Sequence, residues 1–193
     1  MAKGGKRVRI ALIYPNTSSV GLSNLGAFIV HQMLLRHPMV EAHMLFWEEG
    51  PDPSPRIVNS SGRAMDLKYF DAIAFSVSFE NDLLNLPQIL DSYSIPIYSR
   101  ERNTSHPLVI MGGVVSFSNP EPVSDFVDLF LLGEAEAFFQ GFLDHMAQSY
   151  FGLSREEFLL EIQRSFSYAY VPSLYEVEEG SGGTIRGITP KDP

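Results

Sequence analysis

The chain has 193 residues, of which 45% are hydrophobic and 19% charged, a balance typical of a globular domain. Its formal net charge of −9 argues against a nucleic-acid partner, which would require clustered lysine and arginine. The absence of cysteine excludes disulfides, thiolate metal ligands and a cysteine nucleophile. No apolar run approaches the roughly 18 residues that span a bilayer, so we expect a cytoplasmic protein without membrane contact.

Short apolar runs alternate with helical periods along the first 150 residues. Val8–Tyr14 is mostly apolar and rich in β-branched residues, which predicts the first strand. A helix is expected to begin at Ser23, which can cap it, and to stop at His37, because a proline follows. The second strand is predicted at Glu41–Trp47, and a loop rich in proline follows at 50–55.

The same alternation continues through the middle of the chain. Three more strands are predicted at Phe70–Ser78, Leu108–Met111 and Leu129–Leu132. Helices are expected at Asp82–Ser92 and from Gly133 to about Tyr150. Five strand–helix repeats predict an α/β fold of three layers, flavodoxin-like or Rossmann-like. The five-stranded sheet should be parallel, with right-handed crossovers and the strand order 2-1-3-4-5.

The character of the sequence changes after Tyr150. Ser154 and Glu157 have the spacing of a capping box, which predicts a short helix. Val171–Val177 and Thr184–Ile188 flank a turn rich in glycine, so we expect a β-hairpin. We therefore divide the chain into a domain at 1–150 and a helix and hairpin at 151–193. Because no closing element follows, we expect these last residues to lead into a further domain.

The carboxyl ends of parallel strands meet at one edge of a sheet, and ligands bind there. We therefore predict a site formed by the loops after the first, third, fourth and fifth strands. The candidate residues are Asn16, Ser19, Ser23, Ser78, Glu80, Asn81, Gly112, Gly113, Gly133 and Glu134. A purely structural role remains open for these residues, because glycine serves turns and glutamate suits the first turn of a helix.

No catalytic constellation is visible in the sequence. The histidines, His31, His37, His43, His106 and His145, lack the spacing of metal ligands. No lysine of the P-loop type follows a glycine loop, and no GxGxxG follows the first strand. We therefore predict no catalytic residue and no metal site within this chain.

Four segments of the sequence, taken together, carry a resemblance to a known family. They are YPNTSSVGLSNLG, AFSVSFENDLLN, MGGVVSFSNPEPVSDFVDLFLLGEAEAFF and YVPSLYEV. Together they resemble the N-terminal region of radical S-adenosylmethionine proteins with a cobalamin-binding domain. The resemblance implies a cobalamin-binding-like domain, whose partner is a radical S-adenosylmethionine barrel in the same polypeptide. It also implies that the [4Fe–4S] cluster and S-adenosylmethionine belong to that barrel, outside this chain.

The loop after the first strand departs from the family pattern. The Asp-x-His-x-x-Gly motif, whose histidine ligates cobalt, is replaced by PNTSSVGLSNLG, with no histidine and no aspartate. The domain either binds cobalamin without a protein ligand or keeps only the fold. We therefore expect this chain alone to bind cobalamin weakly or not at all. Two alternatives remain: a ligand-free structural domain that packs on the barrel, and a flavodoxin-like phosphate or nucleotide binder at Asn16–Ser23.

Large aromatic side chains are expected where this domain meets the barrel. The candidates for exposed contacts are Phe79, Phe117, Tyr168 and Tyr175.

Overall fold

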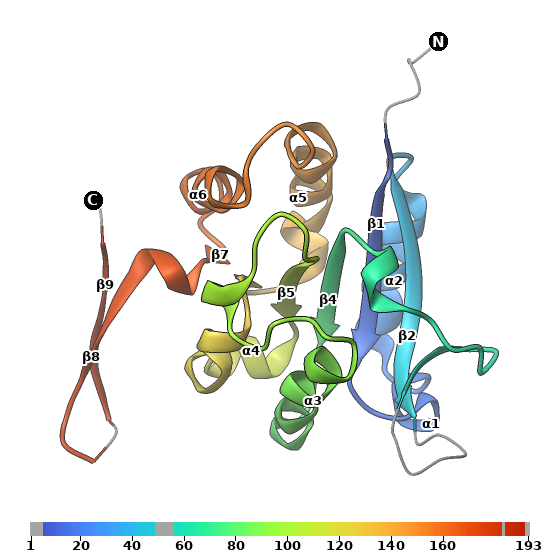
Figure 1. Ribbon diagram of the computed structural model, residues 1–193, viewed down its shortest axis with the longest axis horizontal. Helices are drawn as coiled ribbons and strands as arrows, with labels where there is room; N and C mark the ends of the chain where they lie inside the picture. The colour runs from blue at the N-terminus through green and yellow to red at the C-terminus, as the bar shows by residue number, and fades with distance from the viewer. Residues whose placement is uncertain (1–5, 49–55, 183, 192–193) are drawn as a thin grey trace.

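The computed structural model describes residues 6–48, 56–182 and 184–191, which form a mixed α/β fold with a hairpin beside it (Figure 1). The strands of the main sheet are β1 Val8–Tyr14, β2 Val40–Glu48, β3 Arg56–Asn59, β4 Ala72–Ser76, β5 Leu108–Gly112, β6 Leu129–Leu131 and β7 Ala169–Tyr170. The hairpin consists of β8 Tyr175–Glu179 and β9 Ile185–Pro190. The α-helices are α1 Ser18–Gly21, α2 Leu25–Arg36, α3 Asn85–Ser92, α4 Val114–Ser118, α5 Ala135–Ser149 and α6 Arg155–Ser165. Short 3₁₀ turns lie at Leu67–Tyr69, Glu80–Leu84, Ser99–Glu101, Glu121–Phe126 and Pro172–Leu174.

The main sheet has the strand order β3-β2-β1-β4-β5-β6-β7. Its five central strands are parallel and lie in the predicted order, so the sequence-based prediction of the α/β fold is confirmed. The sheet is larger than predicted, because β3 and β7 add an antiparallel strand at each edge. These two strands have four and two residues, too few to show an alternating pattern in the sequence.

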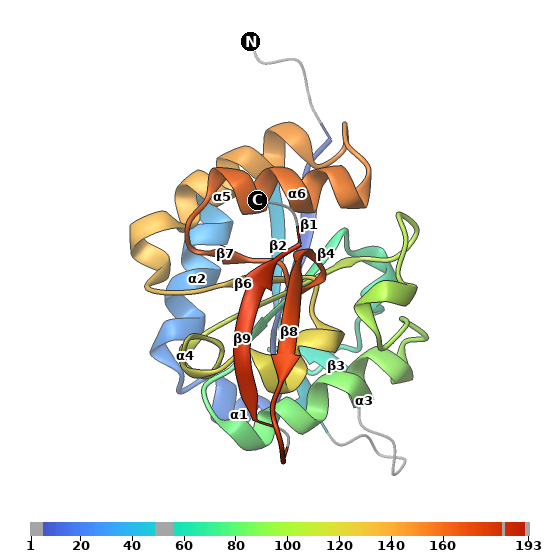
Figure 2. The same ribbon diagram turned by 90° about the vertical axis from the view of Figure 1, so that its left-hand side faces the viewer.

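Helices cover both faces of the sheet, and the two largest apolar cores lie on opposite faces (Figures 1 and 2). Alternate residues of β1 point to opposite faces: Ala11 and Ile13 join the core with α3, whereas Ile10 and Leu12 join the core with α2, α5 and α6. Burial on both faces explains why the strand is one nearly continuous apolar run in the sequence. The three-layer prediction is therefore confirmed.

The first helical region differs from the prediction. The one-turn helix α1 precedes α2, and the cap of α2 is Asn24, whose Oδ1 accepts from the Ala27 N–H at 2.9 Å. The hydroxyl of Ser23 instead donates to the carbonyl of Val20 at 2.7 Å. The predicted cap at Ser23 is therefore wrong by one residue, because the neighbouring asparagine is an equally good cap and lies at the helix start.

The bounds of other strands and helices also differ from the prediction. The predicted strand at Phe70–Ser78 shortens to β4, and the helix predicted from Asp82 begins as a 3₁₀ turn before α3. The loop predicted at 50–55 lies outside the described residues. Within the described part of the chain, no helix is both long and apolar enough to cross a membrane.

The region after Tyr150 contains the predicted capping box and hairpin. The Ser154 Oγ accepts from the Glu157 N–H at 3.2 Å, while the Glu157 carboxylate accepts from the Ser154 N–H at 2.8 Å. The hairpin is confirmed, but its first strand starts at Tyr175 because a 3₁₀ turn occupies Pro172–Leu174. Helix α6 and strand β7 pack into the main domain, whereas the hairpin forms its own sheet (Figure 2).

The aromatic residues predicted at a partner surface divide into two groups. Phe79 and Phe117 are 57% and 67% exposed, as expected. Tyr168 and Tyr175 are only partly exposed: Tyr168 stacks on Phe138 with ring centroids 3.9 Å apart, and Tyr175 packs against Tyr170. The prediction of exposed tyrosines is therefore wrong, because both rings find partners within the chain.

Candidate functional site

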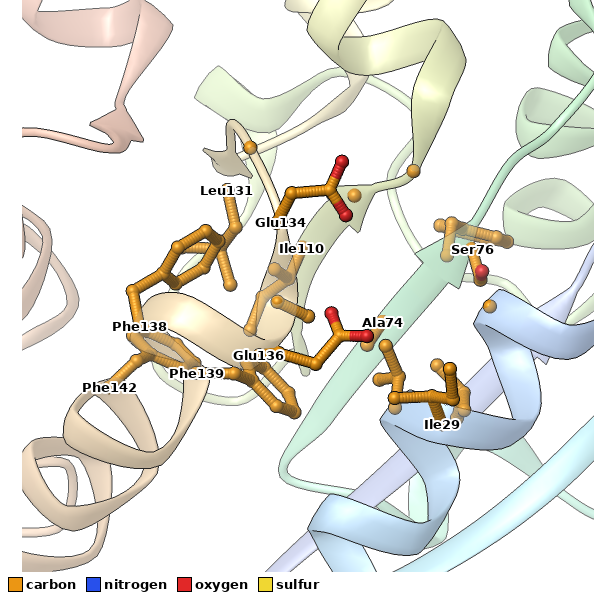
Figure 3. Close-up of a pocket in the computed structure, with 18 of the residues that line it drawn as sticks. Ile29, Ala74, Ser76, Ile110, Leu131, Glu134, Glu136, Phe138, Phe139 and Phe142 are labelled. Carbon is orange, nitrogen blue, oxygen red and sulfur yellow. The ribbon is translucent and has the colours of Figure 1, made fainter.

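A pocket of about 370 Å³ opens between α2 and α5 at the carboxyl edge of the parallel strands (Figure 3). Strands β1, β4, β5 and β6 supply its floor, while Ile29 of α2 and Phe139 of α5 stand on opposite walls. This is the place where doubly wound α/β domains bind ligands, because strand order reverses between β1 and β4. Its volume lies within the range of small-molecule sites, about 300–1,000 Å³.

The floor of the pocket consists of two rows of side chains set by the strand register. Leu12, Ala74 and Ile110 lie side by side across β1, β4 and β5. Two residues further along, Ser76 lies beside Gly112. Because the strands run toward the mouth, the row of Leu12, Ala74 and Ile110 is the inner one and the row of Ser76 and Gly112 the outer one. The inner row is apolar, and the outer row is small or polar.

Half of the predicted site residues line this pocket. They are Ser78, Gly112, Gly113, Gly133 and Glu134. The other five, Asn16, Ser19, Ser23, Glu80 and Asn81, lie outside its lining. Lining residues that the prediction missed include Asn24 and the apolar side chains of α2 and α5. The helical spacing of those apolar residues was visible in the sequence, but it does not reveal a gap between the two helices.

Asn16 belongs to a hydrogen-bond network that joins two loops. Its Nδ2 donates to Asp82 Oδ1 at 2.8 Å, and Asn24 Nδ2 donates to the Ser78 hydroxyl at 2.9 Å. Asp82 is only 4% exposed, and this burial raises the pKa of its carboxyl, against the smaller opposing effect of Asn16. These contacts hold the loops after β1 and β4 together beside the pocket mouth.

Two backbone donors of the loop after β1 are already bonded to side-chain oxygens of the chain. The Ser18 N–H donates to Glu48 Oε1 at 2.6 Å, and the Thr17 N–H donates to Asn16 Oδ1 at 2.7 Å. A phosphate bound at this loop would meet the negative charge of Glu48 and would lose the Ser18 donor. The geometry therefore gives no support to the phosphate-binding alternative at Asn16–Ser23.

Two carboxylates stand at the mouth of the pocket. Glu134 and Glu136 extend from the start of α5 toward the space in front of Ser76 and Ile29 (Figure 3). The lining contains no lysine, arginine or histidine, and within the described residues neither carboxylate forms an ion pair. Such a mouth favours neutral groups with N–H donors over anionic groups.

The histidines lie away from the pocket and within structural contacts. His37 Nε2 lies 3.0 Å from Asp144 Oδ1, which joins the end of α2 to α5, and His145 lies beside Glu161. Among the described residues, no group of three metal-ligating side chains comes together.

The fold and the pocket define a class, the doubly wound α/β domains that present a cavity at the carboxyl ends of their parallel strands. Within that class, the chain belongs to the family described as radical SAM proteins, N-terminal, whose profile matches residues 54–172. The matched residues include β3 to β7 and the whole of α5.

The chain is also similar to Uncharacterized protein MJ0966 of Methanocaldococcus jannaschii, with 27% identity over 127 residues. The match covers 66% of this chain and 24% of that relative, so the chain spans about a quarter of the relative's length. No solved structure matches the chain.

Proposed function

We propose that this chain is a corrinoid-binding module that holds cobalamin at the carboxyl edge of its sheet. The observation that carries the proposal is the pocket between α2 and α5, which is apolar inside and polar at its mouth. Membership in the N-terminal family of radical SAM proteins supports it, because such a module would serve radical chemistry elsewhere in a longer polypeptide. When bound, cobalamin supplies a redox-active cobalt, and the chain binds and orients it.

The apolar side chains of the pocket fit the aromatic base that ends the nucleotide tail of cobalamin, whereas the phosphate of that tail would have to stay in solvent, away from Glu134 and Glu136. Leu12, Ala74 and Ile110 would form an apolar floor for that base, with Phe139 on one side. The polar groups at the mouth would face the amide side chains of the corrin ring. Glu134 and Glu136 would accept hydrogen bonds from those amides, since carboxylates are acceptors only.

The described histidines lie outside the pocket, and the loop after β1 contains no histidine. We therefore propose that the cobalt receives no ligand from this chain. Affinity would then rest on the packing of the base and on hydrogen bonds to the corrin, which is consistent with weak binding.

The proposed partner is a radical S-adenosylmethionine barrel that carries the [4Fe–4S] cluster. The length of the relative from M. jannaschii, of which this chain matches 24%, leaves room for such a domain there. A corrinoid at the carboxyl edge would lie between the barrel and this domain.

A second function, ligand-free docking on the barrel, is favoured by exposed apolar side chains near the same edge. Leu25, Phe79 and Phe117 are 73%, 57% and 67% exposed. Side chains of this size in a group commonly mark a partner surface. This alternative requires no ligand in the pocket and therefore makes the opposite prediction for a titration.

The test uses calorimetry and visible absorption to follow titration of the purified chain with hydroxocobalamin. We expect a dissociation constant in the micromolar range or weaker, where 1 µM corresponds to about −8 kcal/mol. Gly26→Leu places a side chain at the pocket mouth, where a Cβ on Gly26 meets only Asn24 Oδ1 at 3.5 Å. This variant should fold normally and lose binding.

Gly141→Leu is the matched control. Gly141 also lies in a helix and is exposed, and a Cβ added to it would meet no atom within 4 Å, but it does not line the pocket. The Gly141→Leu variant should bind like the parent chain. No binding by the parent chain at millimolar ligand, or equal binding by both variants, would refute the proposal and favour the ligand-free alternative.

A further inference from the structure

Helix α2 is apolar on its outer face as well as on the face that packs on the sheet. Leu34 is fully buried in the core, whereas Leu25 and Leu35 are 73% and 51% exposed. The polar side chains of the helix are only His31, Gln32 and Arg36. A helix at the surface of a domain ordinarily presents a charged and polar face to water. The composition of α2 therefore indicates that another surface covers its outer face.

The outer face of α2 has the spacing of a helix that packs on a second helix. Leu25, Phe28, Gln32 and Leu35 follow one another at intervals of three, four and three residues. These intervals keep one stripe of side chains in line along a helix, as in two-stranded helix pairs. A shallow groove of about 500 Å³, lined by Leu25, Phe28 and Gln32 among others, lies along the same face.

The two ends of this groove carry opposite charges. Arg36 lines the groove at the C-terminal end of α2. Glu136 of α5 stands beside the first half of α2, opposite Ile29 (Figure 3). Within the part of the chain that the structure describes, neither Arg36 nor Glu136 forms an ion pair. A surface with a positive end and a negative end is complementary to itself when one copy is reversed against the other.

We propose that two copies of this chain associate through α2, which packs antiparallel to α2 of the second copy. A two-fold axis between Phe28 and Gln32 places Leu25 of each copy against Leu35 of the other. Arg36 of each copy then faces Glu136 of the other, so two equivalent ion pairs form, as the self-complementary interface of a two-fold dimer requires. A parallel pair would instead bring the two Arg36 side chains together.

The second copy also adds a basic group to the mouth of the pocket between α2 and α5. Glu136 lines this pocket as well as the groove, and the lining of the pocket contains no lysine, arginine or histidine. Arg36 of the second copy supplies the missing positive charge at that place. This inference does not rest on corrinoid binding: a monomeric chain that binds cobalamin would refute the dimer and leave the proposed function intact.

Sedimentation equilibrium of the purified chain measures the association. We expect a dimer with a dissociation constant on the order of 10–100 µM, because one pair of helices buries less area than a standard interface. A chain that stays monomeric at about 1 mM would overturn the proposal.

A matched pair of variants locates the interface. Leu25→Arg places a charge in the stripe, close to Arg36 of the second copy, and should weaken the dimer at least about tenfold. Leu84→Arg makes the same change at another leucine, which is 70% exposed and lies outside α2. This control should associate like the parent chain. Equal weakening by both variants, or by neither, would show that α2 is not the interface.

A charge exchange tests the antiparallel arrangement. Arg36→Glu alone and Glu136→Arg alone each bring like charges together across the interface and should weaken the dimer severalfold. The double variant restores both ion pairs with their signs reversed, so its dissociation constant should return to that of the parent chain. Both residues are exposed, and circular dichroism confirms that the variants are folded. A double variant as weak as the single ones would overturn the pairing of Arg36 with Glu136.

Discussion

Gly113 packs directly against the backbone of Val77, joining the turn after β5 to the end of β4. A Cβ at Gly113 would overlap the Val77 carbonyl oxygen and approach the Val77 nitrogen to 3.0 Å. Gly113 also has φ of 109° and ψ of 174°, a conformation that is essentially reserved for glycine. The backbone conformation and the close packing at position 113 therefore require glycine, whether or not a ligand binds nearby.

Gly113→Ala should lower the free energy of unfolding by about 3 kcal/mol, because it adds backbone strain and a steric overlap. Gly112→Ala is the control: its Cβ would meet the Leu131 carbonyl oxygen at 3.6 Å, an ordinary contact. Urea unfolding of both variants measures the difference. Equal stability of the two would contradict the packing described for Gly113.

Asp128 lies between two buried arginines at the opposite edge of the sheet. Its carboxylate is 3.3 Å from Arg102 and 2.6 Å from Arg155, and it accepts from the Val109 N–H at 2.7 Å. Asp128→Ala would leave both guanidinium groups without their counter-charge and should cost about 3–5 kcal/mol, or prevent folding. Thermal and urea unfolding test this, with Asp128→Asn as a milder variant that keeps an acceptor for Val109.

The control for this cluster is the partly exposed pair of His145 and Glu161, whose atoms lie 3.3 Å apart. Glu161→Ala should change the stability by less than about 1 kcal/mol, since exposed pairs contribute little. If Asp128→Asn were as mild as Glu161→Ala, the buried cluster would have no special role in stability.

The raised pKa of the buried Asp82 carboxyl predicts that the free energy of unfolding depends on pH. Burial raises the pKa of its carboxyl in the folded state, so the folded chain holds this proton more tightly than the unfolded chain does. The resulting contribution to stability is complete below the unfolded-state pKa of about 4 and is lost as the pH rises through the folded-state pKa. Asp82→Asn mimics the protonated form and should therefore be more stable than the parent chain at pH 7, with the gain vanishing below pH 4.

Asp125→Asn controls for the change in net charge, because Asp125 is exposed. Its unfolding free energy should follow that of the parent chain from pH 3 to pH 7. A lower stability of Asp82→Asn at pH 7 would mean that the ionised carboxylate favours the fold.

The capping box at the start of α6 gives a fourth prediction. Ser154→Ala removes the acceptor for the Glu157 N–H and should cost about 1 kcal/mol, the usual effect of losing a serine cap. Ser167→Ala, an exposed serine outside the helices, should be neutral. Urea unfolding measures both variants, and an equal effect would show that the cap is unimportant.

The features that the sequence predicted are those that local patterns determine. The capping box is a pair of residues three positions apart, and the five central strands are apolar runs with turn residues at their ends. The pocket could be predicted only in part. Gly112 and Gly133 follow strands and could be found, but the row of Leu12, Ala74 and Ile110 exists only through the strand register. The same holds for Asp128, whose partners come from two distant segments.

The two antiparallel edge strands restrict how the main sheet can associate with other chains. β3 and β7 have four and two residues, so each outer edge presents only a few unpaired backbone groups. Templated strand addition, the first step of many amyloid-like assemblies, has little to start from at either edge. In the described part of the chain, the exposed hairpin β8–β9 offers longer edges, and Val177, Ile185 and Ile188 are exposed there. Solubility in recombinant expression should therefore depend more on this hairpin than on the large sheet.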